Sequence, residues 1–369
     1  MEIENVIIFT IKITIVNRKY ILPLFFVFQI LIIKILAIFP KEIEQYYSNG
    51  FYPIISRFLR SVFGAIPFSI GDVIYASILI YVIYILLKYK KNWLRNWKNS
   101  LLKLVSVLSL FYFLFHLLWA TNYYRVPLSE KLKIKKEYTD KELLDFTQKL
   151  ITKTNATHIE ITKNKSIKVS NPSSRDKIFV LSQNGYDQLS KEYPFFSYEV
   201  PSRKQSLFSV PLTYMGFGGY LNPFTNESQV NYKLPIYGYP FVISHEMAHQ
   251  IGYASESECN FIAFLACIKN DNLYFKYAAY SMALRYSLAN VKLIDEKKFN
   301  VLKSRVNLGI IENFKENDSF WKQYDTFIDK GFHVFYDQFL KINQQEDGID
   351  SYSKFIDLLI NYYNNKAIE

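Results

Sequence analysis

The chain is poor in the residues from which disulfides and many metal sites are built, with two cysteines and five histidines in 369 residues. Cys259 and Cys267 are eight residues apart in a stretch of helical character. That spacing is about 12 Å along a helix axis, which is too long for a disulfide between them. We therefore expect both cysteines to be small residues of the core.

Acidic residues are also in the minority, with 33 Asp and Glu against 44 Lys and Arg and a net charge of +11. The basic residues gather in "KYKKNWLRNWK" (88–98), a Trp-flanked segment between two apolar runs, and are otherwise scattered among asparagines and glutamates. This distribution is typical of a membrane protein rather than of a nucleic-acid-binding surface, and we predict no nucleic-acid partner. The sequence has no internal repeat and no low-complexity linker.

Three apolar runs near the N-terminus are long enough to cross a lipid bilayer. They cover 21–39, 70–87 and 104–120, and almost no charge interrupts them. Lys34 near the end of the first run can extend its ammonium to the interface. The apolar segment 5–16 is short and lacks the cleavage pattern of a signal peptide, so we expect an interfacial or flexible start.

The basic segment also predicts the orientation of the chain in the membrane. By the positive-inside rule, 88–103 lies in the cytoplasm, and Arg18 and Lys19 place the N-terminus there too. Basic residues in the opposite loop, such as Lys41, weaken the asymmetry. We predict a multi-pass membrane domain over 1–124 and an extracytoplasmic domain over 125–369.

The second domain is expected to be α+β, mainly helical with a small sheet. A helix is predicted over 137–155, starting at Thr139 or Asp140, and two short strands over 158–170. The alternating stretch "SQVNYKL" (228–234) is typical of an edge strand along which an extended peptide could lie. From 241 onwards the pattern is mostly helical.

The segment "HEMAH" (245–249) carries the clearest chemistry. His245 and His249 are four residues apart, so on a helix they share one face and are about 6 Å apart along the axis, within reach of one tetrahedral ion. Glu246 adjoins the first histidine, where its carboxylate can serve as general base towards a metal-activated water. This pattern predicts a Zn²⁺ site with hydrolytic chemistry.

A site with two histidines needs a third protein ligand, and two glutamates are candidates. On a straight helix Glu256 would lie about 10 Å beyond His249, so Gly252 is expected to end the helix and turn the chain back. Ser255 and Glu258 have the spacing of a capping box, which would occupy Glu258 with backbone donors. This reasoning favours Glu256 over Glu258 as the ligand, and Glu258 stays the alternative.

Other types of zinc site fit the sequence less well. The position of a third histidine in metzincins is Ser255, no cysteine precedes residue 259, and 241–268 is too polar for an intramembrane protease. We expect His116 to be a packing residue of the third span and His158 to lie on the surface. Four residues are candidates to donate a hydrogen bond to the transition-state oxyanion, and the sequence assigns the role to none of them: Tyr280, Arg285, Tyr286 and His333.

With "GFGGYLNPFTNESQVN" upstream and "PFSIGDVIY" at the second span, the segment "HEMAHQIGYASESECNFIAFLAC" resembles a family of bacterial membrane proteins. The family is catalogued as domain of unknown function 3810 and regarded as zincin-like. The segment after the histidines is also similar to the helix of glutamate-zincins (gluzincins) that supplies a zinc ligand. This resemblance implies that Glu256 is a metal ligand and Asn260 supports the site from behind, and Cys259 stands where alanine is usual.

Together these features predict a zinc metallopeptidase in the bacterial cytoplasmic (inner) membrane that hydrolyses peptide bonds outside the cytoplasm. Its expected partners are a peptide or protein substrate and the lipid bilayer. Two alternatives share the same site: a non-catalytic zinc-binding membrane scaffold or sensor, and a hydrolase of cell-wall peptide or amide bonds. Retention of Glu246 favours an enzyme, because a structural site needs the ligands but not the base.

Overall fold

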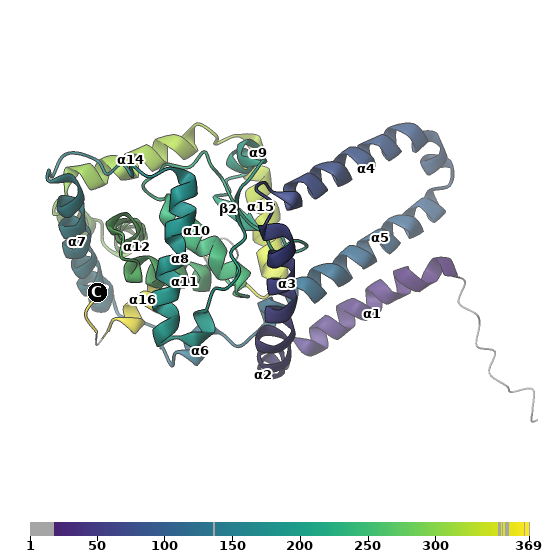
Figure 1. The fold of residues 1–369 in the computed structure, drawn as a ribbon, viewed down its shortest axis with the longest axis horizontal. Helices are drawn as coiled ribbons and strands as arrows, with labels where there is room; N and C mark the ends of the chain where they lie inside the picture. The colour runs from purple at the N-terminus through teal and green to yellow at the C-terminus, as the bar shows by residue number, and fades with distance from the viewer. Residues whose placement is uncertain are drawn as a thin grey trace, which may run out of the picture.

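The computed structural model divides into a helical body and three long helices that project from one end of it (Figure 1). It describes residues 18–135, 137–345, 348, 350, 354–364 and 366–368. The segment 5–16, interpreted as an interfacial or flexible start, lies outside the described residues. The predicted α+β class, with three N-terminal spans, a mainly helical body and a small sheet, is confirmed.

The projecting helices are α1 (Ile21–Leu36), α4 (Ile70–Arg95) and α5 (Trp97–Leu118). Each is long and apolar enough to cross a membrane, with a mean hydropathy of 2.0 to 2.2 and only 11% of the apolar window buried. Helices this apolar and this exposed indicate membrane insertion, as predicted from the sequence. The basic segment 88–98 is not the expected loop, because α4 continues to Arg95 and α5 begins two residues later.

Short elements connect the projecting helices to the body. Pro53 occupies an early position of α3, where its missing N–H leaves no intrahelical bond unmade. The carboxylate of Glu227 accepts the N–H groups of Ile70 and Gly71 at the start of α4, at 3.2 and 2.6 Å, which fixes this helix to the sheet. The connecting elements are η1 (Arg18–Tyr20), α2 (Pro40–Glu42), η2 (Ile43–Phe51), α3 (Tyr52–Gly64), η3 (Ala120–Tyr124) and α6 (Leu128–Lys131).

The body is built around α11, which is apolar on all sides because α8, α10, α12 and α16 surround it. Its buried residues include Phe261, Phe264 and both free cysteines, which are core residues as expected. The helices of the body are α7 (Asp140–Thr162), α8 (Arg175–Glu192), η4 (Pro194–Phe196), α9 (Ser209–Tyr214), α10 (Tyr239–Gln250), α11 (Glu256–Lys269), α12 (Leu273–Ile294), α13 (Glu296–Lys303), α14 (Leu308–Lys322), α15 (Phe327–Ile342) and α16 (Phe355–Tyr362).

The start of α7 at the capping box of Thr139 and Glu142 is as predicted, but the two strands expected over 158–170 are wrong. The helix continues to Thr162 because the side chains of its last turns pack inward. His158 is fully buried and bonds the carbonyl of Ile167 at 2.8 Å, so its prediction as a surface residue is also wrong. His116 is a buried residue of α5, as expected.

The sheet has three short strands in the order β1-β3-β2: β1 (Arg203–Gln205), β2 (Gly219–Leu221) and β3 (Ser228–Val230). β3 pairs in parallel with β1 and antiparallel with β2. The prediction of an edge strand within 228–234 is wrong, because β3 is the central strand and is completely buried. β1 and β2 form the two edges, and Gly219 of β2 lies next to the carboxylate of Glu246.

A buried ion-pair cluster connects the segment before α3 to the body. Glu44 accepts from Arg125 at 2.8 Å on both of its oxygens and from Lys131 at 2.6 Å. Burial raises the pKa of Glu44, but the hydrogen bonds and charges of Arg125 and Lys131 outweigh this and lower the pKa to about 2. The cluster is therefore ionised over the whole physiological range.

Substituting Glu44→Gln is expected to lower the free energy of unfolding by about 3–5 kcal/mol, because it leaves two buried cations without their carboxylate. The measurement is denaturant unfolding of the full chain in detergent micelles. Glu199→Gln is the matched control: it breaks the exposed pair with Arg57 and should cost about 1 kcal/mol or less.

The effect of Glu44→Gln should also depend on pH in a known direction. The folded pKa lies below the ordinary value of 4.5, so the contribution is complete above that pH and is lost as the pH falls towards 2. The difference between the two proteins should therefore be constant from pH 5 to 7 and shrink under acid conditions. A difference that grows on acidification would contradict the assignment.

Candidate metal centre

The helix that carries the two histidines ends at a glycine turn. His245 and His249 lie one turn apart on α10, which ends at Gln250, and Gly252 follows with a φ of +89°. The Tyr253 N–H bonds the Ala248 carbonyl at 3.2 Å, which closes the turn as in a Schellman motif. The predicted helix end at Gly252 is thus confirmed.

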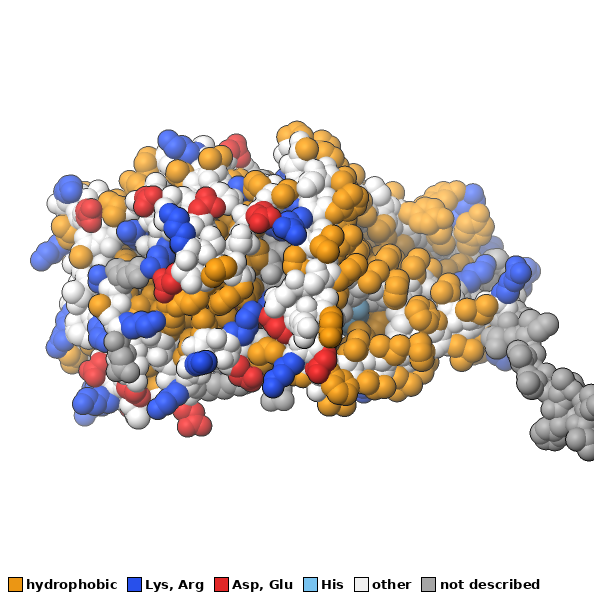
Figure 2. Space-filling model, turned by 60° about the horizontal axis from the view of Figure 1, so that its bottom comes forward, with side chains coloured by type: hydrophobic (Ala, Val, Ile, Leu, Met, Phe, Trp, Pro, Cys, Tyr) orange, Lys and Arg blue, Asp and Glu red, His pale blue; other side chains and the backbone are white. Residues whose placement is uncertain are grey.

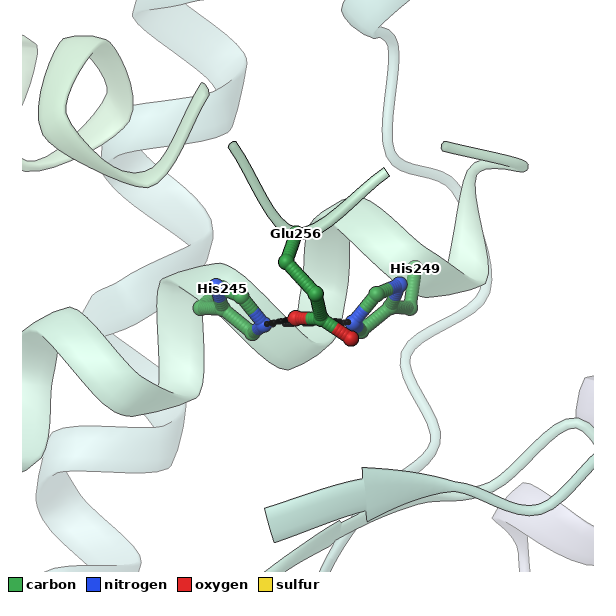
Figure 3. Close-up of side chains that lie close together, drawn as sticks. All are labelled: His245, His249 and Glu256. Carbon is green, nitrogen blue, oxygen red and sulfur yellow. Dashed lines mark hydrogen bonds and ion pairs between the residues drawn. The ribbon is translucent and has the colours of Figure 1, made fainter. Parts of the chain in front are cut away.

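The turn brings α11 back across α10 and carries Glu256 to the two histidines (Figure 3). Oε2 of Glu256 lies 3.1 Å from Nε2 of His245 and 3.6 Å from Nε2 of His249, and the two Nε2 atoms are 3.1 Å apart. Donors that bind one tetrahedral zinc ion at about 2.0–2.1 Å lie about 3.3 Å from each other. The spacing of the three donors therefore fits a single small cation.

The environment of the three donors also fits a cation. All three side chains are buried, and Oε2 of Glu256 accepts no hydrogen bond from the described residues. A buried carboxylate oxygen without a donor is costly unless a positive charge lies beside it. Two imidazoles and one carboxylate are a ligand set suited to Zn²⁺, with further positions left for water or substrate. We refer to His245, His249 and Glu256 as the ligand cluster.

Hydrogen bonds from behind orient both imidazoles. Nδ1 of His245 lies 2.8 Å from Oδ1 of Asn260, and Nδ1 of His249 lies 2.8 Å from the carbonyl oxygen of Tyr253. Both oxygens only accept, so each Nδ1 donates, and Nε2 is the ring atom of each histidine that faces the cluster. Asn260 thus holds the supporting position that the resemblance implied, and Cys259, 3.2 Å from Nδ1 of His249, is a second contact behind that ring.

Glu258 takes a different part in the structure. Its carboxylate accepts the Leu128 N–H at 2.6 Å, away from the ligand cluster. The predicted capping box is wrong, because Ser255 is the N-terminal cap residue of α11 but makes no capping bond with its side chain. Glu258 therefore has a structural contact, as expected, but its partner is the backbone of Leu128 and not the N-terminus of α11.

Glu246 is the carboxylate on α10, and it is also buried. Burial raises its pKa to about 7, and the negative charge of Glu256 acts in the same direction while the two histidines oppose it. Its Oε2 has no hydrogen-bond partner among the described residues. A Cβ added at Gly219 would lie 2.6 Å from Oε1 of Glu246, so the first residue of β2 must be glycine for the strand to approach this carboxylate.

One residue at the cluster escaped sequence reasoning. The hydroxyl of Tyr336 on α15 donates to Oε1 of Glu256 at 2.8 Å, although the two residues are 80 positions apart. The considered oxyanion donors have other contacts. Tyr280 packs against Phe264, Arg285 pairs with Asp318, Tyr286 packs against Phe355, and His333 pairs with Asp329. With 30 tyrosines in the chain, no sequence signal distinguished Tyr336.

The chain belongs to the family described as "Protein of unknown function (DUF3810)", which matches residues 47–360. The match includes the second and third spans, the sheet and the whole ligand cluster. No curated protein and no solved structure matches the chain. The family membership expected from the motifs is thereby confirmed, and the chemistry rests on the geometry of this chain.

The geometry predicts different effects for the two competing glutamates. Glu256→Gln should abolish retention of a divalent cation, because it removes the anionic donor of the cluster, and His245→Ala should do the same. Glu258→Gln, two residues away on the same helix, is the matched control and should retain about one ion per chain. Asn260→Ala should weaken affinity about 10–100-fold.

The measurement is metal content of the purified full chain by mass spectrometry, followed by competition with a chromogenic chelator. Metal loss in Glu258→Gln with retention in Glu256→Gln would reverse the assignment of the ligand.

Proposed function

We propose that this protein is a membrane-anchored, zinc-dependent metallopeptidase of the gluzincin type. The observation that carries the proposal is the convergence of His245, His249 and Glu256 at tetrahedral spacing beside a buried second carboxylate, Glu246. A purely structural zinc site is usually closed by four protein ligands and needs no neighbouring base. Three ligands and a base are the composition of a hydrolytic site.

The residues of the chain divide the work of hydrolysis between them. A zinc ion held by the ligand cluster supplies Lewis acidity, which makes water more acidic and a carbonyl more electrophilic. Glu246 accepts a proton from water as the water oxygen bonds to the peptide carbonyl carbon. The carbon–nitrogen bond then breaks and Glu246 returns the proton to the leaving amine, so water is the one co-reactant consumed.

The edge strand β2 supports binding of an extended peptide. β2 pairs with β3 on one side only, and its Gly219 adjoins Glu246. A peptide that adds to the open edge as a further strand would pass next to the general base. The sequence predicted peptide binding along the stretch 228–234, which contains the central strand β3. We assign this binding to the neighbouring edge strand, β2, instead.

The orientation proposed for the chain places the ligand cluster outside the cytoplasm. The basic segment 88–98 spans the junction of α4 and α5, at the end of these helices that is remote from the body (Figure 1). By the positive-inside rule that end is cytoplasmic, so the body is on the other side of a bacterial cytoplasmic membrane.

Two alternative functions would use the same ligand cluster. A non-catalytic scaffold or sensor would need the ligands but would have no use for Glu246. A hydrolase of cell-wall peptide or amide bonds would use the same chemistry on a different substrate, and the extracytoplasmic orientation is compatible with it.

Replacing the general base should separate catalysis from metal binding. Glu246→Gln is expected to keep the metal, because Glu246 is not in the ligand cluster, and to lower the rate of peptide cleavage about 10²–10⁴-fold. The measurement is cleavage of a peptide library by the full chain in detergent, read by mass spectrometry, with metal content determined on the same samples. Equal cleavage by both proteins, or none by either with metal bound, would refute the peptidase.

Reporter fusions after residue 369 test the orientation. A reporter that matures only outside the cytoplasm should be active, and one that functions only in the cytoplasm should be silent. The opposite pair of results would place the body in the cytoplasm.

A further inference from the structure

The ligand cluster lies directly at the end of a membrane span. Trp119 is the first residue after α5, and its indole N–H donates to the carbonyl oxygen of His249 at 3.3 Å. The Trp119 and His249 rings are 5.9 Å apart between centroids. Trp119 itself is buried between the span and the body. One side chain at the end of α5 therefore connects this span directly to the ligand cluster.

An amphipathic helix, α3, lies across the base of the spans on the same side (Figure 1). Its buried face consists of Tyr52, Ser56 and Arg60, and the hydroxyl of Tyr52 bonds the Gln250 carbonyl at 2.9 Å next to the cluster. Its opposite face carries an apolar stripe that is 41–65% exposed. The stripe, with the preceding residue included, is Phe51, Ile54, Phe58 and Val62.

The helix α15 has the same construction. Tyr336 and Leu340 face the body, while the opposite face presents an apolar stripe that is 64–84% exposed, formed by Phe327, Val334, Phe335 and Ile342. Phe339 of α15 contacts Phe115 of the span α5, with ring centroids 6.3 Å apart. The apolar surface of α15 is thus joined to that of a span.

The bilayer is the partner that fits both stripes. In Figure 2 the hydrophobic side chains that cover the projecting helices continue onto the adjoining edge of the body, where some charged side chains also lie; more charged side chains are spread over the rest of the body. Helices with one exposed apolar face and lysines on the flanks, such as Lys330 and Lys341 on α15, are typical of segments that lie in the membrane interface. Exposed apolar stripes beside the candidate spans are in a position to meet the same lipid.

The helix that bears one of these stripes also covers the ligand cluster. Tyr336 bonds Glu256, and its ring packs against Phe217 at 4.8 Å between centroids. Beyond the end of α15, the side chain of Gln345 accepts the Glu256 N–H at 3.1 Å and donates to the Ala254 carbonyl at 3.2 Å. The helix α15 therefore closes the side of the cluster that lies next to the spans.

We infer that α3 and α15 rest on the bilayer surface and that the metal centre acts on polypeptide segments tethered to the same membrane, by a span or a lipid anchor. The substrate class rests on the proposed peptidase function, whereas the lipid contact of the two helices does not. Tethering holds the cleavable segment at the level of the cluster and raises its effective concentration there.

The first arm of the experiment tests the lipid contact alone. Spin labels are attached to Phe58→Cys and Phe335→Cys in the full chain in nanodiscs, and Val180→Cys on α8 is the matched control, an exposed apolar residue on the body. The native cysteines are buried, so labelling is selective. The ratio of collisions with oxygen to collisions with a water-soluble nickel complex should be about fivefold or more higher at Phe58 and Phe335. Ratios equal to that of Val180 would overturn the inference.

The second arm tests the substrate class. Peptides cleaved in the library are attached to a lipid in proteoliposomes, through spacers of about 3 residues, which reach up to about 10 Å, or about 30 residues. The short spacer should be cleaved at least about tenfold faster than the long one or the free peptide. Equal or faster cleavage of the free or long-spacer peptide would overturn the membrane-tethered assignment. If no form is cleaved while the spin labels contact lipid, the peptidase function fails and only the lipid contact stands.

Discussion

The structure depends on one turn of the backbone, at Gly252, where the chain reverses between α10 and α11. A side chain at this position would meet the Tyr52 ring at 2.9 Å, and the φ of +89° favours glycine as well. The guanidinium of Arg125 donates to the Gly252 carbonyl at 2.6 Å while it also pairs with Glu44. The same turn therefore positions the third ligand and fixes the metal centre to the segments that connect it to the membrane.

Burial gives two carboxylates on neighbouring helices opposite character. The histidines hold Glu256 ionised despite its burial, so its pKa is well below the ordinary range. Glu246 has no comparable partner, and burial raises its pKa to about 7. One carboxylate is thus suited to hold a cation and the other to exchange a proton near neutral pH, which is the division of labour that metal-assisted hydrolysis requires.

The candidate spans contact the ligand cluster and the sheet directly, rather than being joined to the body through a linker. Trp119, at the end of α5, contacts the backbone and ring of a ligand, and Glu227 connects the sheet to the start of α4. Changes in the packing of the spans would therefore reach the ligands through one or two contacts. In a protein with a long linker between membrane and catalytic body, the two would be independent.

The spans, the shared face of the two histidines and the turn at Gly252 could be predicted from the order of residues, because each depends on spacing within one element. The hydropathy of three runs predicted the spans, the interval of four between the histidines predicted a shared helix face, and Gly252 predicted the turn. Predictions from local spacing were wrong where contacts with distant residues determine the structure. Glu258 bonds Leu128, 130 positions away, instead of forming the expected capping box. The two strands expected over 158–170 do not form, because His158 packs inward and α7 continues to Thr162.

Three features became known from the folded structure. They are the contact of Glu256 with the histidines, the place of β2 at the edge of the sheet, and the positions of Tyr336 and Trp119 at the cluster. These contacts join residues far apart in the chain, and the angle between α10 and α11 comes from packing around a shared core. The spacing of residues within one element can be taken from a single sequence. The path that brings distant segments of the chain together cannot.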